Sequence, residues 1–536
     1  MMRSIKIPHL LNKIFSVLFI TTFSMLLVLI LSKGYVNEGD SNTYNCSINQ
    51  RFCIFISFLM FVLSAMIFYL TLNRICDRSR LIRTVDKDLY VPLIILTACA
   101  FMFIFQLAVG YLLACEPVTD VKILNVFSAD FAKDGDFSLI KTDFMDYYMV
   151  RYKNNLLILF ILSLIYRISY LLTGAVSVYL PIFINALAIN ISVILTVFLS
   201  RKLFGNRVAF IVLFLCLLFA PYYTYVSYYY TDSLSMPFFI GSLYLFVYAF
   251  NSKSLLKELS LLALCGALLY FSFKLKGSGI IIIAALALYL LLKLDFKRAA
   301  VIAAALLIGI ALLSNFYISK VNENRVITPE LSERYEYPYT HWVMIGLKGY
   351  GNYNQKDSDF TRKYSSKELK TSANIAKIKS RINKYGLKGL VKHLAKKAVW
   401  TWEDGTYYIS HHIENPIHRN ILHDYALNSG EKHFVFYGYS CAFQLFMILM
   451  MIFSAYKSFK NPKLDFTTLL RIIVFGAFIF FLIWETRSRY LYNLTPLFII
   501  LTADGMSIVG EELRLLPRRG FLNRRVYLPR ERNDYN

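Results

Sequence analysis

Residues 91–120 read VPLIILTACAFMFIFQLAVGYLLACEPVTD, and this stretch decides the class of the protein. Its first 25 positions hold no charged side chain, and the carboxylates Glu116 and Asp120 follow directly. An α-helix rises about 1.5 Å per residue, so about 20 apolar residues cross the hydrocarbon core of a bilayer. The stretch therefore predicts a transmembrane helix with an aspartate just beyond its end.

Similar apolar stretches recur along the whole chain of 536 residues, of which 57% are hydrophobic and 17% are charged. This composition excludes a soluble globular protein, and the lack of strand-like alternation excludes a membrane barrel. The predicted fold class is an all-α polytopic membrane protein, a bundle of about 12 transmembrane helices with a long outer loop domain. The predicted spans are 12–32, 53–72, 91–114, 176–199, 207–225, 233–250, 256–272, 277–293, 299–317, 434–455, 468–484 and 490–510.

The formal charge of +24 follows a topological pattern. With the N-terminus inside, nearly every short basic connection lies in the cytoplasm, as the positive-inside rule requires. The excess charge therefore needs no nucleic-acid partner; membrane lipids account for it. We predict a cell-membrane protein with both termini cytoplasmic and its first apolar run retained as an anchor. The basic residues are Arg74, Arg78, Arg80, Arg83, Arg201, Lys202, Arg207, Lys253, Lys257, Lys293, Lys297, Arg298, Lys457, Lys460, Lys463, Arg514, Arg518, Arg519, Arg524 and Arg525.

Two long segments, 116–176 and 318–433, are predicted to lie outside. The apolar stretch 154–172 is not counted as a span, because a further crossing would place the basic cluster at 201–207 outside. It is predicted as a juxtamembrane helix along the outer surface. The lysine-rich region around 375–397 has apolar residues at helical spacing. It suits a helix on an anionic leaflet or, equally, one that packs on its own loop domain.

The cysteines carry little information about chemistry. The chain has eight, with no paired CxxC spacing typical of a metal site. Cys46 and Cys53 share one short outer loop, and a disulfide and two free thiols are both open there.

Two aspartates are the leading candidates for chemistry. Asp120 follows the third span and could take a proton from a hydroxyl at the membrane surface. Asp232, in the stretch Tyr230-Thr231-Asp232, precedes the sixth span and could orient a hydroxyl or a metal. The alternative is that each aspartate, or the threonine before it, caps a helix N-terminus. Tyr230 belongs to a tyrosine cluster that could stack on a sugar or form an interfacial belt.

Basic side chains lie at the same predicted surface. Lys274 and Lys276 fall on an outer turn, where a cation binds an anion or reaches the head groups. Arg487 and Arg489 could clamp a phosphate, or pair internally with Glu485. His341 and Trp342 could line a carbohydrate cleft, although a single histidine is more often structural.

Motifs for nucleotides are absent from the sequence. There is no Walker A loop and no GxGxxG after a strand, so a nucleotide sugar is not the expected donor. Almost no ionisable residue lies at the centre of a predicted span, which disfavours an energised transporter.

Taken together, the chain resembles the GT-C superfamily of polyprenyl-phosphate-sugar glycosyltransferases, which includes protein mannosyltransferases and aminoarabinose transferases. More closely, it looks like a Gram-positive bacterial family of such proteins. The resemblance covers about residues 91–510 and rests on the order of its motifs. These are Asp120, Gly135-Asp136-Phe137-Ser138, Tyr152…Asn154-Asn155, Arg201-Lys202-Leu203-Phe204-Gly205-Asn206-Arg207, Tyr230-Thr231-Asp232-Ser233-Leu234, Lys274-Leu275-Lys276-Gly277, His341-Trp342, Trp402-Glu403-Asp404-Gly405 and Arg487-Ser488-Arg489-Tyr490-Leu491.

The resemblance implies roles and a domain plan. Asp120 would be the catalytic base, Asp232 a second carboxylate, and Lys276 and Arg489 ligands of the donor phosphate. Asp120 lacks the acidic neighbour of the protein mannosyltransferases, which puts a protein acceptor in doubt and leaves a divalent cation open. The domains would be two extra helices (1–90), a catalytic core (91–317), an outer loop domain (318–433), C-terminal helices (434–510) and a basic tail (511–536).

The implied function is transfer of a sugar from a polyprenyl-phosphate carrier to an extracytoplasmic acceptor, with inversion. The acceptor would be a wall polysaccharide, a teichoic-type polymer or a glycolipid. The alternative is a non-enzymatic transporter or scaffold for lipid-linked oligosaccharides.

Overall fold

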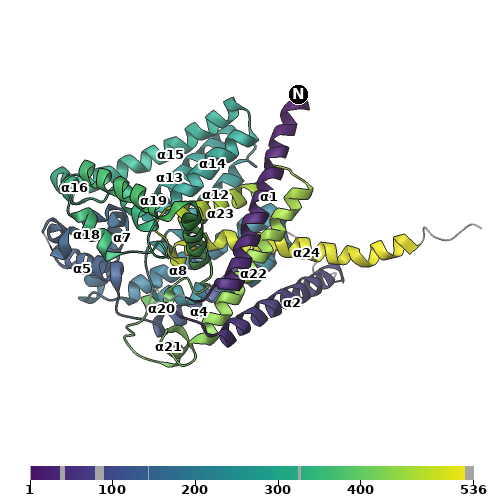
Figure 1. The fold of residues 1–536 in the computed structure, drawn as a ribbon, viewed down its shortest axis with the longest axis horizontal. Helices are drawn as coiled ribbons and strands as arrows, with labels where there is room; N and C mark the ends of the chain where they lie inside the picture. The colour runs from purple at the N-terminus through teal and green to yellow at the C-terminus, as the bar shows by residue number, and fades with distance from the viewer. Residues whose placement is uncertain (1, 37–42, 79–89, 143, 324–326, 525–536) are drawn as a thin grey trace, which may run out of the picture.

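The computed structural model describes residues 2–36, 43–78, 90–142, 144–323 and 327–524, and they form a bundle of α-helices (Figure 1). Within these ranges there is no β-strand, only an isolated bridge between Cys115 and Pro416. Eleven helices are long and apolar enough to cross a membrane. The prediction of an all-α polytopic membrane protein is confirmed.

Ten of the twelve predicted spans coincide with one of these eleven helices. Their boundaries differ by several residues because the helices continue beyond the apolar stretch into the loops. The ten are α1 (Met2–Lys33), α2 (Ile48–Arg78), α4 (Tyr90–Leu112), α8 (Tyr179–Phe204), α12 (Met236–Ala249), α13 (Leu255–Leu275), α15 (Phe296–Glu323), α22 (His433–Lys460), α23 (Phe466–Ile483) and α24 (Thr495–Arg524), which the 3₁₀ helix η6 (Ser488–Leu494) precedes.

The other two predicted spans are irregular. The span predicted at 207–225 is broken into α9 (Asn206–Leu218) and a second piece, α10 (Pro221–Thr224) with η4 (Tyr225–Ser227), with a bend of 62°. Pro221 stands at the start of α10, where its missing N–H favours a new helix over continuation of the old one. The span predicted at 277–293 is η5 (Gly277–Gly279) followed by the short helix α14 (Ile280–Lys293).

The eleventh apolar helix, α7 (Leu156–Thr173), is the stretch predicted to lie along the surface. Asn155, at its start, accepts a hydrogen bond from Tyr230. Five residues after its end α8 begins, where the ring of Tyr179 lies 5.7 Å from that of Tyr111 at the end of α4. Both ends of α7 thus lie at the end of the bundle where α4 ends and α8 begins, which we call the site end. This geometry favours the predicted surface helix over a crossing.

The remaining helices come almost entirely from the two long segments predicted to lie outside. They gather at the site end, where α5, α7, α16 and α18 lie together on the left of Figure 1. They are α5 (Thr119–Asp134), η1 (Ser138–Lys141), η2 (Phe144–Tyr147), α6 (Tyr148–Arg151), η3 (Lys153–Asn155), α11 (Thr231–Leu234), α16 (Pro329–Tyr335), α17 (Thr340–Gly346), α18 (Gln355–Arg362), α19 (Lys367–Trp402), α20 (Ile409–His412) and α21 (Ile421–Ala426).

The two N-terminal helices pack against the C-terminal part of the chain. α1 lies along α22, and α2 contacts α22 and α24. The Phe23 ring lies 5.4 Å from Trp402, and the backbone N–H of Tyr35 donates to Glu403 at 2.7 Å. At the other end of α1, Asn12 donates to the carbonyl of Lys463 at 2.9 Å. Cys46 lies in the connection between α1 and α2, whereas Cys53, predicted to share this loop, lies inside α2; both are free thiols.

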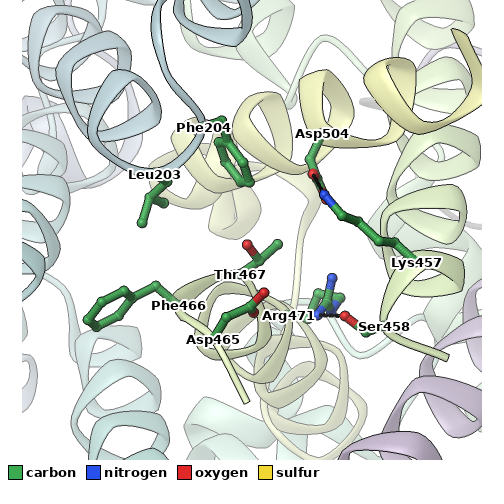
Figure 2. Close-up of a pocket in the computed structure, with 9 residues that line it drawn as sticks. All are labelled: Leu203, Phe204, Lys457, Ser458, Asp465, Phe466, Thr467, Arg471 and Asp504. Carbon is green, nitrogen blue, oxygen red and sulfur yellow. Dashed lines mark hydrogen bonds and ion pairs between the residues drawn. The ribbon is translucent and has the colours of Figure 1, made fainter. Parts of the chain in front are cut away.

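A polar cavity of about 190 Å³ lies at the opposite end of the bundle, between the ends of α8, α22 and α23 and the interior of α24 (Figure 2). Buried Arg471 donates to the Ser454 carbonyl at 3.0 Å and to the Ser458 hydroxyl at 2.5 Å. Asp504 accepts from Ser454 at 2.6 Å. These contacts tie three helices together. Asp504 follows Arg489 by 15 residues, more than about 20 Å along the helix, so this cavity is far from the site described next.

The basic residues Arg80, Arg83 and Arg525 of the predicted cytoplasmic face lie outside the described residues.

Candidate functional site

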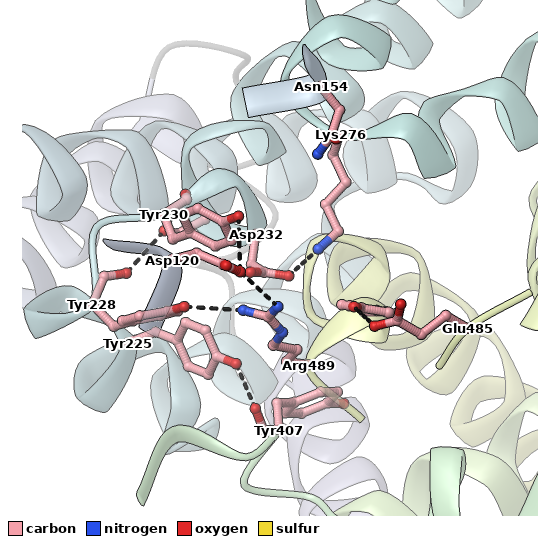
Figure 3. A network of polar contacts seen from close by, with 12 residues as sticks. Asp120, Asn154, Tyr225, Tyr228, Tyr230, Asp232, Lys276, Tyr407, Glu485 and Arg489 are labelled. Atoms are coloured by element: carbon pink, nitrogen blue, oxygen red, sulfur yellow. Dashed lines mark hydrogen bonds and ion pairs between the residues drawn. The ribbon is translucent and has the colours of Figure 1, made fainter. Parts of the chain in front are cut away.

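Four helical crossings bring the candidate residues to one place at the site end. Asp120 follows α4, Asp232 follows the bent α9–α10 pair, Lys276 follows α13, and Arg489 follows α23. Because these crossings all end on the same side of the bundle, the four side chains converge (Figure 3). The two aspartates therefore share one face, as the distribution of basic loops requires.

Asp120 is the more accessible carboxylate. It lies in the first turn of α5, whose N-cap residue is Val118, so the alternative of an aspartate cap does not hold. One carboxylate oxygen accepts from the Tyr148 hydroxyl at 2.7 Å, and the other accepts from Tyr230 at 3.3 Å. The side chain remains 33% exposed. Asp120 is thus held in place by two phenols and still open to a hydroxyl that must lose a proton.

Asp232 is fully buried and forms an ion pair with Lys276 through Oδ1. Its Oδ2 has no hydrogen-bond partner among the described residues. The N-cap of α11 is Tyr230, so Asp232 does not cap this helix either. A buried carboxylate oxygen without a donor is costly unless a ligand supplies one. The pair therefore combines a fixed cation with a free acceptor.

Arg489 lies next to the Asp120 carboxylate in Figure 3. One guanidinium nitrogen is 3.5 Å from Asp120, and another donates to the Tyr228 hydroxyl at 3.0 Å. The guanidinium also stacks on the rings of Tyr230 and Tyr490, at 5.4 and 5.2 Å from their centres. Its Nε has no hydrogen-bond partner among the described residues. Packing on two rings fixes the guanidinium plane, as recognition of a phosphate requires.

Glu485 and Tyr490 close the site on the side of α23. The Tyr490 hydroxyl donates to Glu485 at 2.8 Å, and the Lys276 ammonium lies 4.7 Å from the centre of the Tyr490 ring. Burial raises the pKa of the Glu485 carboxyl, and the Tyr490 hydrogen bond and nearby Arg489 partly offset this. The Glu485 carboxylate thus accepts a hydrogen bond from Tyr490.

Four predicted site residues point elsewhere or lie at the edge. Lys274 lies over the rings of Tyr270 and Tyr317, at 5.5 and 5.3 Å, and not beside Lys276. Arg487 stacks on Tyr408 at 4.0 Å, next to the site.

His341 and Trp342 belong to the loop domain. His341 is buried, shares a hydrogen bond with Thr361 at 2.8 Å, and has its pKa lowered by burial to about 3. Trp342 stacks on Trp484, with ring centres 5.7 Å apart. The structural role that is usual for a single histidine fits His341 here.

His412 is a site residue that the sequence did not single out. Its ring stacks on Tyr228 with centres 4.0 Å apart and planes 6° from parallel. The side chain is buried, and neither ring nitrogen has a hydrogen-bond partner among the described residues. Burial, followed by the positive charge of Arg489, lowers the pKa of His412 well below its usual value. A neutral imidazole thus faces the site with one N–H and one acceptor nitrogen.

Asp404 holds the loop that carries His412 against the last helices. Its carboxylate accepts from the backbone N–H groups of Thr406 and Tyr408 and from the Ser488 hydroxyl, each at 2.8 Å. Ser488 directly precedes Arg489, so Asp404 positions that arginine. Gly405 leaves no space for a Cβ, which would lie 1.9 Å from the Ser440 carbonyl oxygen. The stretch Trp402-Glu403-Asp404-Gly405 is therefore a positioning turn.

The described residues contain no group of three or more His, Cys, Asp or Glu side chains placed to hold a metal ion. Lys276 and Arg489 already contact the two aspartates, and their positive charges oppose a divalent cation between them. The donor set at this point is suited to an anion.

Comparisons with known proteins were made on the whole chain. A search of curated proteins found no match. Among solved structures, the archaeal oligosaccharyltransferase AglB from Archaeoglobus fulgidus, in complex with an inhibitory peptide and a dolichol-phosphate, matches with a TM-score of 0.43 and 13% identity. The match covers 82% of this chain but only 52% of AglB. ArnT from Cupriavidus metallidurans, bound to undecaprenyl phosphate, matches with a TM-score of 0.35 and 13% identity over 79% of each chain.

One protein family, described as conserved hypothetical integral membrane protein, matches residues 6–507. This range includes every helix that contributes to the site. The chain belongs to that family of integral membrane proteins.

Proposed function

We propose that this protein transfers a sugar from a polyprenyl monophosphate carrier to an acceptor hydroxyl outside the cell. The observation that carries the proposal is the convergence of a half-open carboxylate, Asp120, with its neighbour Arg489 and with the buried Asp232–Lys276 pair. The sequence motifs that resemble GT-C transferases supply these same residues, which supports the same class.

Each of these residues has a separate role in a displacement reaction. The acceptor oxygen attacks the anomeric carbon while its proton passes to Asp120. The bond between that carbon and the phosphate oxygen breaks, and the electron pair leaves with the lipid phosphate. Lys276 and Arg489 stabilise the charge that builds on this oxygen. One displacement inverts the anomeric configuration. The unpartnered oxygen of Asp232 accepts a hydrogen bond from a hydroxyl of the bound sugar.

The position of the site suits a lipid-borne donor. Asp120 lies in the first turn after a membrane helix, and Lys276 lies between two apolar helices. A carrier whose tail stays in the bilayer presents its phosphate at this depth. A wall polysaccharide, a teichoic-type polymer or a glycolipid would reach the exposed side of Asp120 from outside.

The test is Asp120→Asn, with Asp134→Asn as control because Asp134 is exposed at the far end of the same helix. Loss of a general base lowers the rate by about 10²–10⁴. Wall and lipid glycans of cells that carry Asp120→Asn should match those of cells without the gene, while Asp134→Asn should match wild type. Purified Asp120→Asn should still bind undecaprenyl phosphate.

A transporter or scaffold gives a different result. It has no use for a general base, so unchanged glycans in the Asp120→Asn strain, with the protein present at normal levels, would overturn the proposal.

A further inference from the structure

Helix α19 has an unusual charge distribution that the proposed reaction does not use. Between residues 369 and 402 there is no acidic residue. Six of its lysines are exposed, and none pairs with a carboxylate in the part of the chain that the structure describes. The six are Lys377, Lys379, Lys384, Lys388, Lys392 and Lys396. So many like charges repel one another unless an anion lies against them.

One side of α19 is fixed to the rest of the protein. The Tyr385 hydroxyl donates to the Leu347 carbonyl at 3.1 Å, and Arg381 pairs with Asp357 at 2.6 Å. Lys397 donates to the carbonyls of Leu482 and Trp484, at 3.1 and 2.6 Å, where membrane helix α23 ends. The lysine-rich turns that precede Lys397 therefore begin at the bilayer surface of the site end.

The free side of the same turns is apolar as well as basic. Leu387 is 83% exposed and Val391, one turn later, is 59% exposed. Lys388 and Lys392 follow the same four-residue spacing beside them; Lys384 lies before the break at Gly386, and Lys396 is exposed with its ammonium 3.8 Å from the centre of the Tyr350 ring. Gly386, with a φ of 59°, bends the helix within this surface, just before Leu387. A short apolar ridge beside a basic ridge is typical of helices that lie in the head-group layer.

We propose that the surface formed by residues 384–396 binds anionic phospholipid head groups of the leaflet at the site end. The lysines contact lipid phosphates, and Leu387 and Val391 enter the boundary between head groups and acyl chains. The apolar side chains favour a lipid surface over a soluble polyanion, because only a bilayer removes them from water. Since Lys397 holds the end of α23 just before Glu485 and Arg489, this contact also steadies the site.

The full-length protein is tested in nanodiscs of phosphatidylcholine alone or with about one third phosphatidylglycerol. Hydrogen exchange of the amides in 384–396 should be at least about fivefold slower in the anionic discs. A variant with Lys384, Lys388, Lys392 and Lys396 all replaced by Gln should lose this difference. Replacing Lys133, Lys356, Lys363 and Lys432, exposed lysines on other elements of the site end, should leave it intact.

Two further arms make the outcome decisive. Leu387→Ser with Val391→Ser, which keeps every charge, should weaken the protection. The proposal would be overturned if the amides of 384–396 exchanged at the same rate in both kinds of disc, or if the control variant lost the difference as the Gln variant does. If dextran sulfate, a soluble polyanion, protects these amides in phosphatidylcholine discs as strongly as anionic discs do, the ligand of this surface is a soluble polyanion and the lipid proposal is wrong. No donor or acceptor is needed, so the result is independent of the proposed transfer reaction.

Discussion

The buried charged clusters at the two ends of the bundle, one around Arg471 and Asp504 and the other around Asp232 and Arg489, are built differently. At the cavity end, Arg471 donates hydrogen bonds to Ser454, Ser458 and Thr468, and Asp504 accepts from Ser454. Of the polar atoms of Arg471 and Asp504, only Arg471 Nε lacks a partner in the part of the chain that the structure describes. At the site end, one oxygen of Asp232, Nε of Arg489 and both ring nitrogens of His412 have no partner among the described residues.

The difference indicates what each cluster is for. Buried polar groups are normally paired within the protein, and an unpaired one at a functional site is open to a ligand. The cavity-end cluster joins α22, α23 and α24 with its own side chains. The site-end cluster has donors and acceptors that are free to bind a ligand. Substitutions should therefore affect stability at one end and ligand binding at the other.

The largest effect is expected from Lys276→Met, which tests whether the site-end cluster depends on its ion pair. It leaves buried Asp232 without its counter-ion, and loss of one partner of a buried pair costs about 3–5 kcal/mol. The protein should unfold at a markedly lower temperature in detergent. The double variant Asp232→Asn with Lys276→Met removes both charges and should recover most of that loss while binding undecaprenyl phosphate poorly. If the double variant stays as unstable as the single one, Asp232 is not held by the ion pair.

A smaller effect, on stability alone, is expected from Arg471→Leu. It removes hydrogen bonds to two serines and leaves Asp504 with less charge compensation, at a cost of about 2–4 kcal/mol. The melting temperature should fall, but the affinity of the surviving folded protein for undecaprenyl phosphate should equal that of wild type. A tenfold loss of affinity in folded Arg471→Leu would mean that the two clusters are coupled.

The smallest effect separates binding from stability at His412. His412→Phe keeps the stack on Tyr228 and removes two buried nitrogens that lack partners, so the melting temperature should stay unchanged or rise slightly. If the imidazole N–H contacts the lipid phosphate, affinity for undecaprenyl phosphate should fall by about tenfold. A fall in melting temperature with unchanged affinity would instead make His412 a packing residue.

Sequence patterns could predict much of this architecture. The length of the apolar stretches located most spans. The basic loops indicated which ends of the spans share a side of the membrane, and so placed Asp120, Asp232, Lys276 and Arg489 on one face. Bilayer thickness sets the length of each apolar stretch, and the positive-inside rule sets the charge of each short loop. Both signals lie in contiguous residues, so they can be found in the sequence. The bend at Pro221 and the short helix after Gly279 were not predicted, because apolar length alone does not report a break.

The finer details of the site depend on contacts that the sequence does not display. Lys274 and Lys276 look equivalent in the sequence, yet Lys274 lies in the last turn of α13 and Lys276 follows the helix end, so they diverge. His412 and Asp404 acquire their positions from a turn that packs on α22 and η6, hundreds of residues from Asp120. No local spacing signals such a contact.

The packing of α1 has a consequence for how the protein is made. Asn12 in this first helix finds its acceptor at Lys463, 451 residues later. A ribosome adds about 5–20 residues per second, so α1 waits roughly half a minute to a minute and a half in the bilayer before α22 and α23 emerge. Throughout that time its buried face, with Asn12 and Phe23, is turned to lipid or to an insertion factor. Helix α1 thus enters the membrane long before these native neighbours do.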